Sequence, residues 1–142
     1  MREDKVNPLL ENQVCFAMYA WSRELIKRYK PCLDELELTY TQYITMMVLW
    51  EQGEATVKEL GDALYLDSGT LTPLLKKLEA KNLVVRRRST RDERNLLVSL
   101  TEAGARLQEK ARDISEQMAG CTALNREEMQ TMYRILYKML DN

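Results

Sequence analysis

The sequence predicts a mainly α-helical fold with a small β-hairpin, arranged as a winged helix-turn-helix in a single domain of 142 residues. The first observation is a pair of short helices: one is capped at Thr56 and ends near Leu64, and the next opens at Ser68 after a three-residue turn. The second observation is two β-rich runs at residues 83–88 and 95–100, joined by a polar loop. This hairpin would be the wing.

The region before this unit is predicted to be helical. Asn-Pro at residues 7–8 is typical of a helix start, and apolar periodicity then continues to about Tyr29. Pro31 predicts the end of that helix, with a short helix through Leu36 after it. Two apolar stripes run along the first helix, so a partner as well as the chain's own core is expected to cover it. The stripes are Leu10, Val14, Met18, Trp21 and Leu25, and beside them Cys15, Tyr19, Ile26 and Tyr29.

Capping boxes of the type Thr-x-x-Gln and Thr-x-x-Glu begin two of the central helices, at Thr39 and Thr56. The first of these runs to about residue 51 and is closed by Gly53. The second helix of the DNA-reading pair is expected from Ser68 to about Lys81, with leucines at 71, 74, 75 and 78 inward. Pro73 lies too deep for an ideal first turn if Ser68 is the N-cap, so we expect a distorted start.

Apolar residues recur at coiled-coil-like spacing after residue 101, and Asn125 with Glu128 predicts the cap of a last helix. We expect residues 8–36 and 102–142 to form a homodimer around a DNA-reading unit at residues 40–101. A symmetric dimer would read a palindromic operator. The spaced residues are Leu107, Ala111, Ile114, Met118 and Cys121, and the last helix is expected to turn Met129, Met132, Tyr133, Leu136 and Leu140 inward.

Basic charge is concentrated on the second helix and the hairpin. Residues 76–94 contain eight lysines and arginines against three acidic residues, a local charge of +5 in a chain of net charge −1. Such concentration is typical of binding to the phosphates of double-stranded DNA. Alternation along the strand puts Arg86 and Arg88 on one side, facing phosphate, and Arg87 on the other, although basic residues also protect exposed strand edges. On the helix, the expected DNA-binding residues are Ser68, Thr70, Thr72 and Lys76.

Composition argues against several other classes of protein. No run of about 18 apolar residues and no secretion leader is found, so we expect a cytoplasmic protein without a membrane partner. The three cysteines are an odd number, lie far apart and form no Cys-x-x-Cys, which disfavours a disulfide scaffold and a zinc site. The chain has no histidine, the commonest general base and metal ligand. We therefore expect no enzyme, metal or cofactor.

Several motifs resemble the MarR-type winged-helix repressors, and within that family the organic hydroperoxide resistance regulators. The DNA-reading unit carries Leu78-Glu79-Ala-Lys-Asn-Leu83-Val-Val-Arg86, Arg91-Asp92-Glu93-Arg94 and Leu100-Thr101-Glu102-Ala-Gly104. The subgroup resemblance is in Glu11-Asn-Gln-Val-Cys15-Phe16, Tyr19, Tyr29-Lys-Pro31, Thr39-Tyr40-x-Gln42-Tyr43, Leu49-Trp50-Glu51 and residues 65–73. The resemblance therefore spans nearly the whole chain. It implies that Arg94 enters the minor groove of DNA and that Asp92 fixes the loop of the wing.

The resemblance also implies that Cys15 is oxidised by an organic hydroperoxide, whereupon the repressor leaves its operator. Tyr19, one turn after Cys15, could donate a hydrogen bond to its thiolate, whereas Tyr29 is ~21 Å further along the helix. By resemblance, Tyr29 and Tyr40 reach Cys15 across the dimer. Cys121 stands where a resolving cysteine would be, or completes the apolar spacing; without it, a low-molecular-weight thiol would cap the sulfenic acid.

Two alternative functions are also compatible with the sequence. A MarR-type repressor could instead be released by reversible binding of a small aromatic or anionic ligand, with Cys15 incidental. A thiol-dependent peroxidase is disfavoured, because the chain lacks a β-rich thioredoxin-like pattern. Cys32, beside Pro31, is expected to be structural.

Overall fold

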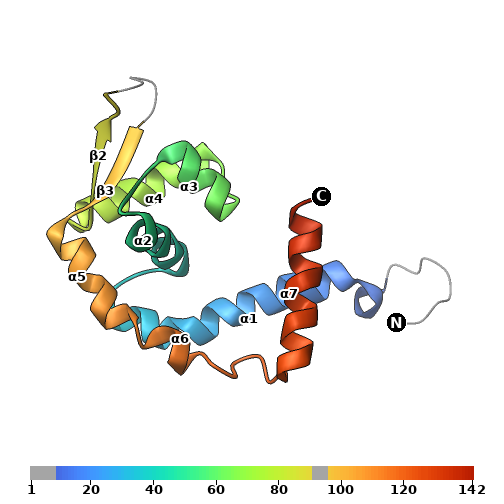
Figure 1. Ribbon diagram of the computed structural model, residues 1–142. Coiled ribbons are helices and arrows are strands. Elements are labelled where there is room, and N and C mark those ends of the chain that lie inside the picture. Colours follow the sequence, from blue (N-terminus) through green and yellow to red (C-terminus); the bar gives the residue numbers. More distant parts are fainter. Residues whose placement is uncertain (1–8, 91–95) are drawn as a thin grey trace.

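The computed structural model describes residues 9–90 and 96–142 (Figure 1). It is mainly helical with one small sheet, and the winged helix-turn-helix predicted from the sequence is confirmed. No helix in the described ranges is long and apolar enough to cross a membrane. In chain order the elements are η1 (Leu10–Asn12), α1 (Val14–Glu35), α2 (Tyr40–Gln52), β1 (Glu54–Thr56), α3 (Val57–Leu64), α4 (Ser68–Ala80), β2 (Val84–Arg88), β3 (Leu96–Leu100), α5 (Glu102–Ala111), α6 (Ile114–Gln117) and α7 (Arg126–Leu140).

The capping boxes read from the sequence fix three helix starts. At Thr39, Thr56 and Asn125 the side chain accepts from the backbone N–H three residues on, and that residue's side chain accepts from the cap's N–H. Gly53 closes α2 with a φ of 81°, as expected for a C-cap glycine.

The sheet has three antiparallel strands in the order β1-β3-β2, not the two-stranded hairpin expected. The additional strand, β1, pairs Glu54–Thr56 with residues 97–99 of β3. A strand of three residues is too short to show an alternating pattern, so it could not be predicted from the sequence. Because a lone two-stranded hairpin is only marginally stable in water, β1 supports the wing by covering the other edge of β3.

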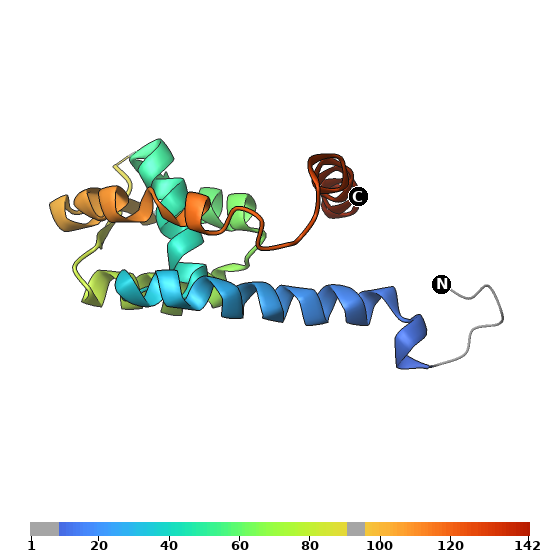
Figure 2. The same ribbon diagram turned by 90° about the horizontal axis from the view of Figure 1, so that it is seen from below.

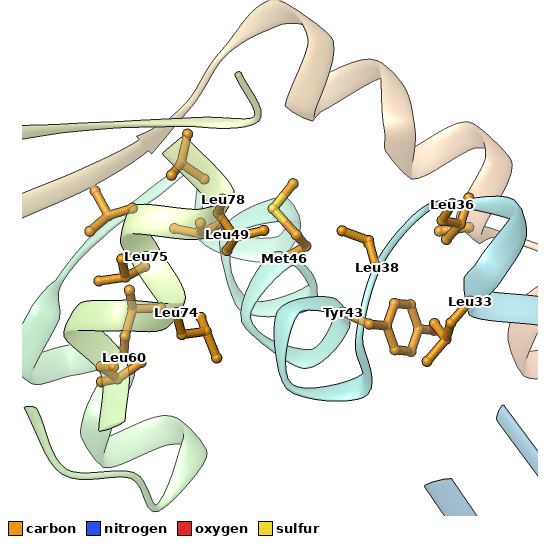
Figure 3. Close-up of a cluster of buried hydrophobic side chains, with 14 of the residues drawn as sticks. Leu33, Leu36, Leu38, Tyr43, Met46, Leu49, Leu60, Leu74, Leu75 and Leu78 are labelled. Carbon is orange, nitrogen blue, oxygen red and sulfur yellow. The ribbon is translucent and has the colours of Figure 1, made fainter. Parts of the chain in front are cut away.

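The core lies where α2, α3 and α4 meet the sheet (Figure 3). Leu71, Leu74, Leu75 and Leu78 of α4 are all buried, as their spacing predicted. Met46 and Leu49 of α2 lie against them and are completely buried. The core continues to the C-terminal end of α1 through Leu33 and Leu36, which anchors that helix to the DNA-reading unit.

The prediction that Pro31 ends the first helix is wrong. Helix α1 begins at Val14, after the turn η1, and continues through Pro31 to Glu35. An internal proline costs a helix about 3 kcal/mol because it removes one N–H donor and crowds the preceding turn. Here Leu33, 2% exposed, and Leu36, 7% exposed, are buried in the core beyond it, and this packing offsets the cost. The predicted start at residues 7–8 lies outside the described residues.

The expected start of α4 also needs correction. The N-cap is Asp67 rather than Ser68, since the Thr70 N–H donates to Asp67 Oδ1 at 2.7 Å. Hydrogen bonds from the Thr70 side chain and backbone hold the pKa of Asp67 below its usual value. The helix then runs unbroken through Pro73, so the predicted distortion is absent.

The apolar residues after residue 101 do not form one continuous helix for dimerisation. The chain turns after Ala111 and again after Gln117, and Gly120 takes a φ of 78°. Ile114 and Met118 are 2% and 9% exposed, and they are buried in the chain's own core together with Ala111. Packing within the subunit therefore accounts for this pattern.

Within the subunit, many apolar side chains of helix α7 and of the first half of α1 are exposed to solvent. Figure 2 shows α7 apart from α1, although the two cross in Figure 1. No residue of α7 is buried, and Tyr133 and Leu140 are 64% and 50% exposed rather than inward within the subunit. Large apolar side chains left in water on two helices of one subunit indicate a surface that a second subunit would cover.

Candidate functional site

The second helix of the helix-turn-helix, α4, presents the side chains predicted to bind DNA. Ser68, Thr70, Thr72 and Lys76 are all exposed, and the leucines of the opposite face hold the helix in the core. The Thr72 hydroxyl donates to the Ser68 carbonyl at 2.8 Å, and its oxygen can still accept a hydrogen bond. The geometry therefore offers a row of short polar groups with one cation, as a groove-facing helix requires.

The structure does not present the wing arginines as strand alternation suggested. Arg86, expected to face phosphate, is instead half-buried, and its Nη2 lies 3.1 Å from Glu79 Oε1 on α4. Arg87 Nη2 lies 3.1 Å from Glu54 Oε2 on β1, and both of these side chains are exposed. Arg88 is exposed at the end of β2. Asp92 and Arg94, expected at the tip of the wing, lie outside the described residues.

A cluster of aromatic rings joins the C-terminal half of α1 to α2. The ring centroids of Tyr29 and Tyr40 are 5.1 Å apart in an edge-on arrangement, and those of Tyr29 and Tyr43 are 6.2 Å apart. Trp50 extends the cluster at 6.3 Å from Tyr43, and its indole N–H donates to the Gly104 carbonyl at 2.8 Å. Tyr29 and Tyr40 were expected to act together. The spacing of Tyr43, three residues after Tyr40 on the same helix face, was the available signal for the third ring.

Burial gives these phenols a defined protonation state. Burial raises the pKa of Tyr29, and the nearby Tyr40 and Tyr43 hydroxyls raise it further. Burial also raises the pKa of Tyr40. Both side chains therefore keep their protons well above neutral pH and remain hydrogen-bond donors.

Cys121 and Cys32 lie at the same end of α1. Arg28 donates a hydrogen bond from Nη1 to the Cys121 carbonyl, and the Cys32 thiol donates to Gln117 Oε1 at 2.9 Å. Both cysteines are near enough to Tyr29 to contribute, after burial and the two tyrosines, to its raised pKa. The structure thus gathers Tyr29, Tyr40 and Cys121 in one region, with Cys32 as an additional thiol.

Cys15 lies at the other end of the same helix and is exposed in the first turn of α1. Tyr19 follows one turn later, 57% exposed, and its hydroxyl accepts a hydrogen bond from Arg23 Nη1 at 3.2 Å. Fourteen residues of helix, or about 21 Å at 1.5 Å per residue, separate Cys15 from Tyr29. Within one subunit the predicted redox residues therefore form two groups, one at each end of α1.

Comparison with known proteins gives matches over most of the chain. The profile of the family described as "Transcriptional regulator SarA/Rot" matches residues 27–112. The organic hydroperoxide resistance transcriptional regulator of Bacillus subtilis is 51% identical over 132 residues, which are 93% of this chain and 90% of that protein.

Solved structures of AbfR, a protein of Staphylococcus epidermidis, are similar to this chain. Reduced AbfR bound to DNA has a TM-score of 0.76 at 36% identity, with 93% of this chain and 92% of that chain covered. Disulfide-formed AbfR has a TM-score of 0.66 at 34% identity, with 92% of each chain covered. Overoxidised AbfR bound to DNA has the same TM-score of 0.76, so the fold described here is nearer to DNA-bound AbfR in either state than to the disulfide-formed protein.

Proposed function

This chain belongs to the SarA/Rot family of MarR-like winged-helix transcriptional regulators, and from that premise we propose that it is a repressor that organic hydroperoxide releases from DNA through oxidation of Cys15. Like its relatives it is a regulator rather than an enzyme. Its partners are double-stranded DNA, read by the exposed face of α4, and a second copy of the chain. The DNA-bound form of a similar protein supports DNA as a partner.

The observation that carries the redox proposal is the division of the predicted site between the two ends of α1. A second subunit whose α1 crosses antiparallel brings its Tyr29, Tyr40 and Cys121 to the exposed Cys15 of the first. The uncovered apolar residues of α1 and α7 support this pairing, because both helices expose large side chains that the subunit itself leaves in water. We assign dimerisation to α1 and α7, and DNA reading to residues 40–101.

The chemistry requires a thiolate at Cys15 with hydrogen-bond donors around it. The thiolate attacks the peroxide, so that an S–O bond forms, the O–O bond breaks, and the alkoxide takes a proton and leaves as alcohol. Tyr29 and Tyr40 suit the donor role because their raised pKa values keep both phenols protonated. The thiol of the partner subunit's Cys121 can then attack the sulfenic sulfur, forming the disulfide and releasing water.

A movement of Tyr40 at the redox site can be transmitted through α2 to the recognition helix α4. Tyr40 is the first residue of α2, and Met46 and Leu49 of the same helix pack in the core beside α4. Because the core is close-packed, a shift of α2 moves α4 with it. Two recognition helices must lie one DNA turn apart, roughly 34 Å, to occupy successive major grooves. A change in that spacing in the oxidised dimer would release the operator.

The test compares wild type with single Cys→Ser variants in DNA binding before and after cumene hydroperoxide. The probe is a duplex selected by the reduced wild-type protein from a random-sequence pool. We expect oxidation to abolish binding by wild type and to leave Cys15→Ser bound. Cys32→Ser is the matched control and should respond as wild type does.

A non-reducing gel of the same samples assigns the resolving thiol. Oxidised wild type should run as a covalent dimer and Cys121→Ser as a monomer. If wild type releases DNA yet stays monomeric on the gel, a small thiol caps Cys15 and Cys121 is not the resolving residue. If Cys15→Ser also releases DNA, the redox mechanism is wrong and a reversibly bound ligand is the remaining explanation.

A further inference from the structure

A carboxylate on the recognition helix holds the first strand of the wing. Glu79 Oε2 accepts a hydrogen bond from the Arg86 backbone N–H at 3.1 Å, and Oε1 accepts one from the Arg86 guanidinium at 3.1 Å. One side chain thus binds both the backbone and the charge of a single residue on β2. Because Glu79 lies in the last turn of α4, this contact joins the recognition helix directly to the wing.

This pair is more shielded than the ion pair between Arg87 and Glu54 in the same sheet. The side chains of Arg86 and Glu79 are 20% and 39% exposed, whereas those of Arg87 and Glu54 are 62% and 50% exposed. Charge-assisted hydrogen bonds are strong where solvent is partly excluded, and exposed pairs contribute little. The side-chain and backbone hydrogen bonds from Arg86 hold the pKa of Glu79 below its usual value, so the carboxylate is charged at neutral pH.

The surroundings of the pair fix the direction in which β2 leaves α4. Asn82 turns the chain with a φ of 60°, and the Leu83 N–H donates to the Leu78 carbonyl at 3.1 Å. Arg86 then lines a hollow between α3, α4 and the sheet, together with Ser68 and Thr72 of the recognition helix. Its guanidinium is therefore directed toward the body of the DNA-reading unit.

We propose that Glu79 and Arg86 form a positioning pair that sets the wing at a fixed place relative to the recognition helix. Arg86, in this view, binds no DNA phosphate, although it lies in the most basic segment of the chain. A phosphate-binding role and a positioning role differ in the salt dependence of DNA binding. An arginine bound to a phosphate releases a counterion and adds about one unit per subunit to the slope of log K against the logarithm of salt concentration. A positioning residue acts on DNA only through the wing, so removing either partner of the pair changes the affinity and the slope in the same way.

The test measures affinity by fluorescence anisotropy across a salt series, with the same selected duplex and reduced protein. The variants are Arg86→Ala, Arg86→Lys, Glu79→Gln and the double variant Glu79→Gln/Arg86→Ala. Arg87→Ala is the matched control, because it removes an equal charge from the neighbouring position of the same strand. Circular dichroism of each variant establishes that the fold is retained, and Arg86→Lys and Glu79→Gln serve where Arg86→Ala does not fold.

We expect Arg86→Ala and Glu79→Gln each to weaken binding about tenfold and to have the same salt slope as each other. The double variant should bind no more weakly than either single variant, since each change breaks the same contact. Arg86→Lys should also bind more weakly, although it keeps the charge, whereas Arg87→Ala should lose about twofold or less.

Three results would overturn the proposal. A salt slope reduced by about one per subunit in Arg86→Ala and not in Glu79→Gln would make Arg86 a phosphate contact. Tighter binding by Glu79→Gln would have the same meaning, because the neutral amide frees the guanidinium for DNA. Unchanged binding by every variant at residues 79 and 86 would show that the pair has no part in DNA recognition.

Discussion

A single methyl group added at Gly104 should separate the wing from the helix that follows it. A Cβ built at this buried glycine overlaps the Leu83 carbonyl oxygen and lies 3.0 Å from its carbon and 3.3 Å from Leu100 Cδ2. The Leu83 carbonyl accepts from the Thr101 N–H at 3.1 Å, so it joins the start of β2 to the start of α5. The overlap is between the backbone of α5 and the backbone carbonyl of Leu83, so neither group can easily move away.

The expected loss of stability follows from two opposing effects. Overpacking against backbone costs about 3 kcal/mol, the upper end of the usual range, because no flexible side chain can absorb the overlap. Alanine is favoured over glycine inside a helix by about 1 kcal/mol. The net destabilisation of Gly104→Ala is therefore about 2 kcal/mol, which lowers Tm by about 6 °C for a chain of this size.

Thermal unfolding by circular dichroism at one fixed protein concentration measures this effect, since Tm of a dimer depends on concentration. Gly69→Ala is the matched control: that glycine lies in the first turn of α4, and its added Cβ would meet only Asp67 Oδ1, at 3.5 Å. Gly69→Ala should melt at or slightly above wild type. If Gly104→Ala has the same Tm as Gly69→Ala, the close approach of α5 to Leu83 does not constrain the fold.

Three further predictions concern stability, assembly and DNA binding. Burial raises the pKa of Tyr29 and Tyr40 above the ordinary value of 10.0, so the unfolded chain loses these protons first and stability should fall as pH rises above that value. In denaturant titrations at increasing pH, the free energy of unfolding of Tyr40→Phe should fall less steeply than that of wild type. An equally steep fall in the variant would refute this prediction. Leu136→Arg on the apolar face of α7 should give a monomer in sedimentation experiments, whereas Thr131→Arg on the polar face should stay dimeric. Arg94→Ala should reduce the salt slope of DNA binding by about one per subunit, and an unaltered slope would exclude the wing tip from DNA.

Local signals in the sequence were sufficient for most of the fold. The Thr39, Thr56 and Asn125 boxes placed three helix starts, because a cap depends on residues only three positions apart. The leucine spacing of α4 identified its buried face for the same reason. Pro31 shows where such reasoning fails: the local cost of proline is real, but the packing of Leu33 and Leu36 outweighs it.

The sequence predicted many of the residues of the candidate site, but few of the contacts between them. Family resemblance grouped Tyr29 with Tyr40 as partners of Cys15 across a dimer. Their rings lie 5.1 Å apart within one subunit, and their contact with Cys15 stays a prediction. The pairing of Arg86 with Glu79 was not foreseen. Strand alternation gives the side of the sheet on which a side chain lies, but it does not say what lies on that side.

The sequence by itself determined the helix-turn-helix, the wing and the basic segment, because each depends on composition or on spacing along the chain. The candidate cysteine and tyrosines came from family resemblance. Tertiary structure decided which apolar residues the subunit buries for itself. Ala111, Ile114 and Met118 are covered by the chain's own core, whereas the apolar face of α7 is not. Both patterns have the same helical period, and periodicity specifies a face without specifying its partner. Only the packed arrangement distinguishes a core helix from one that awaits a second subunit.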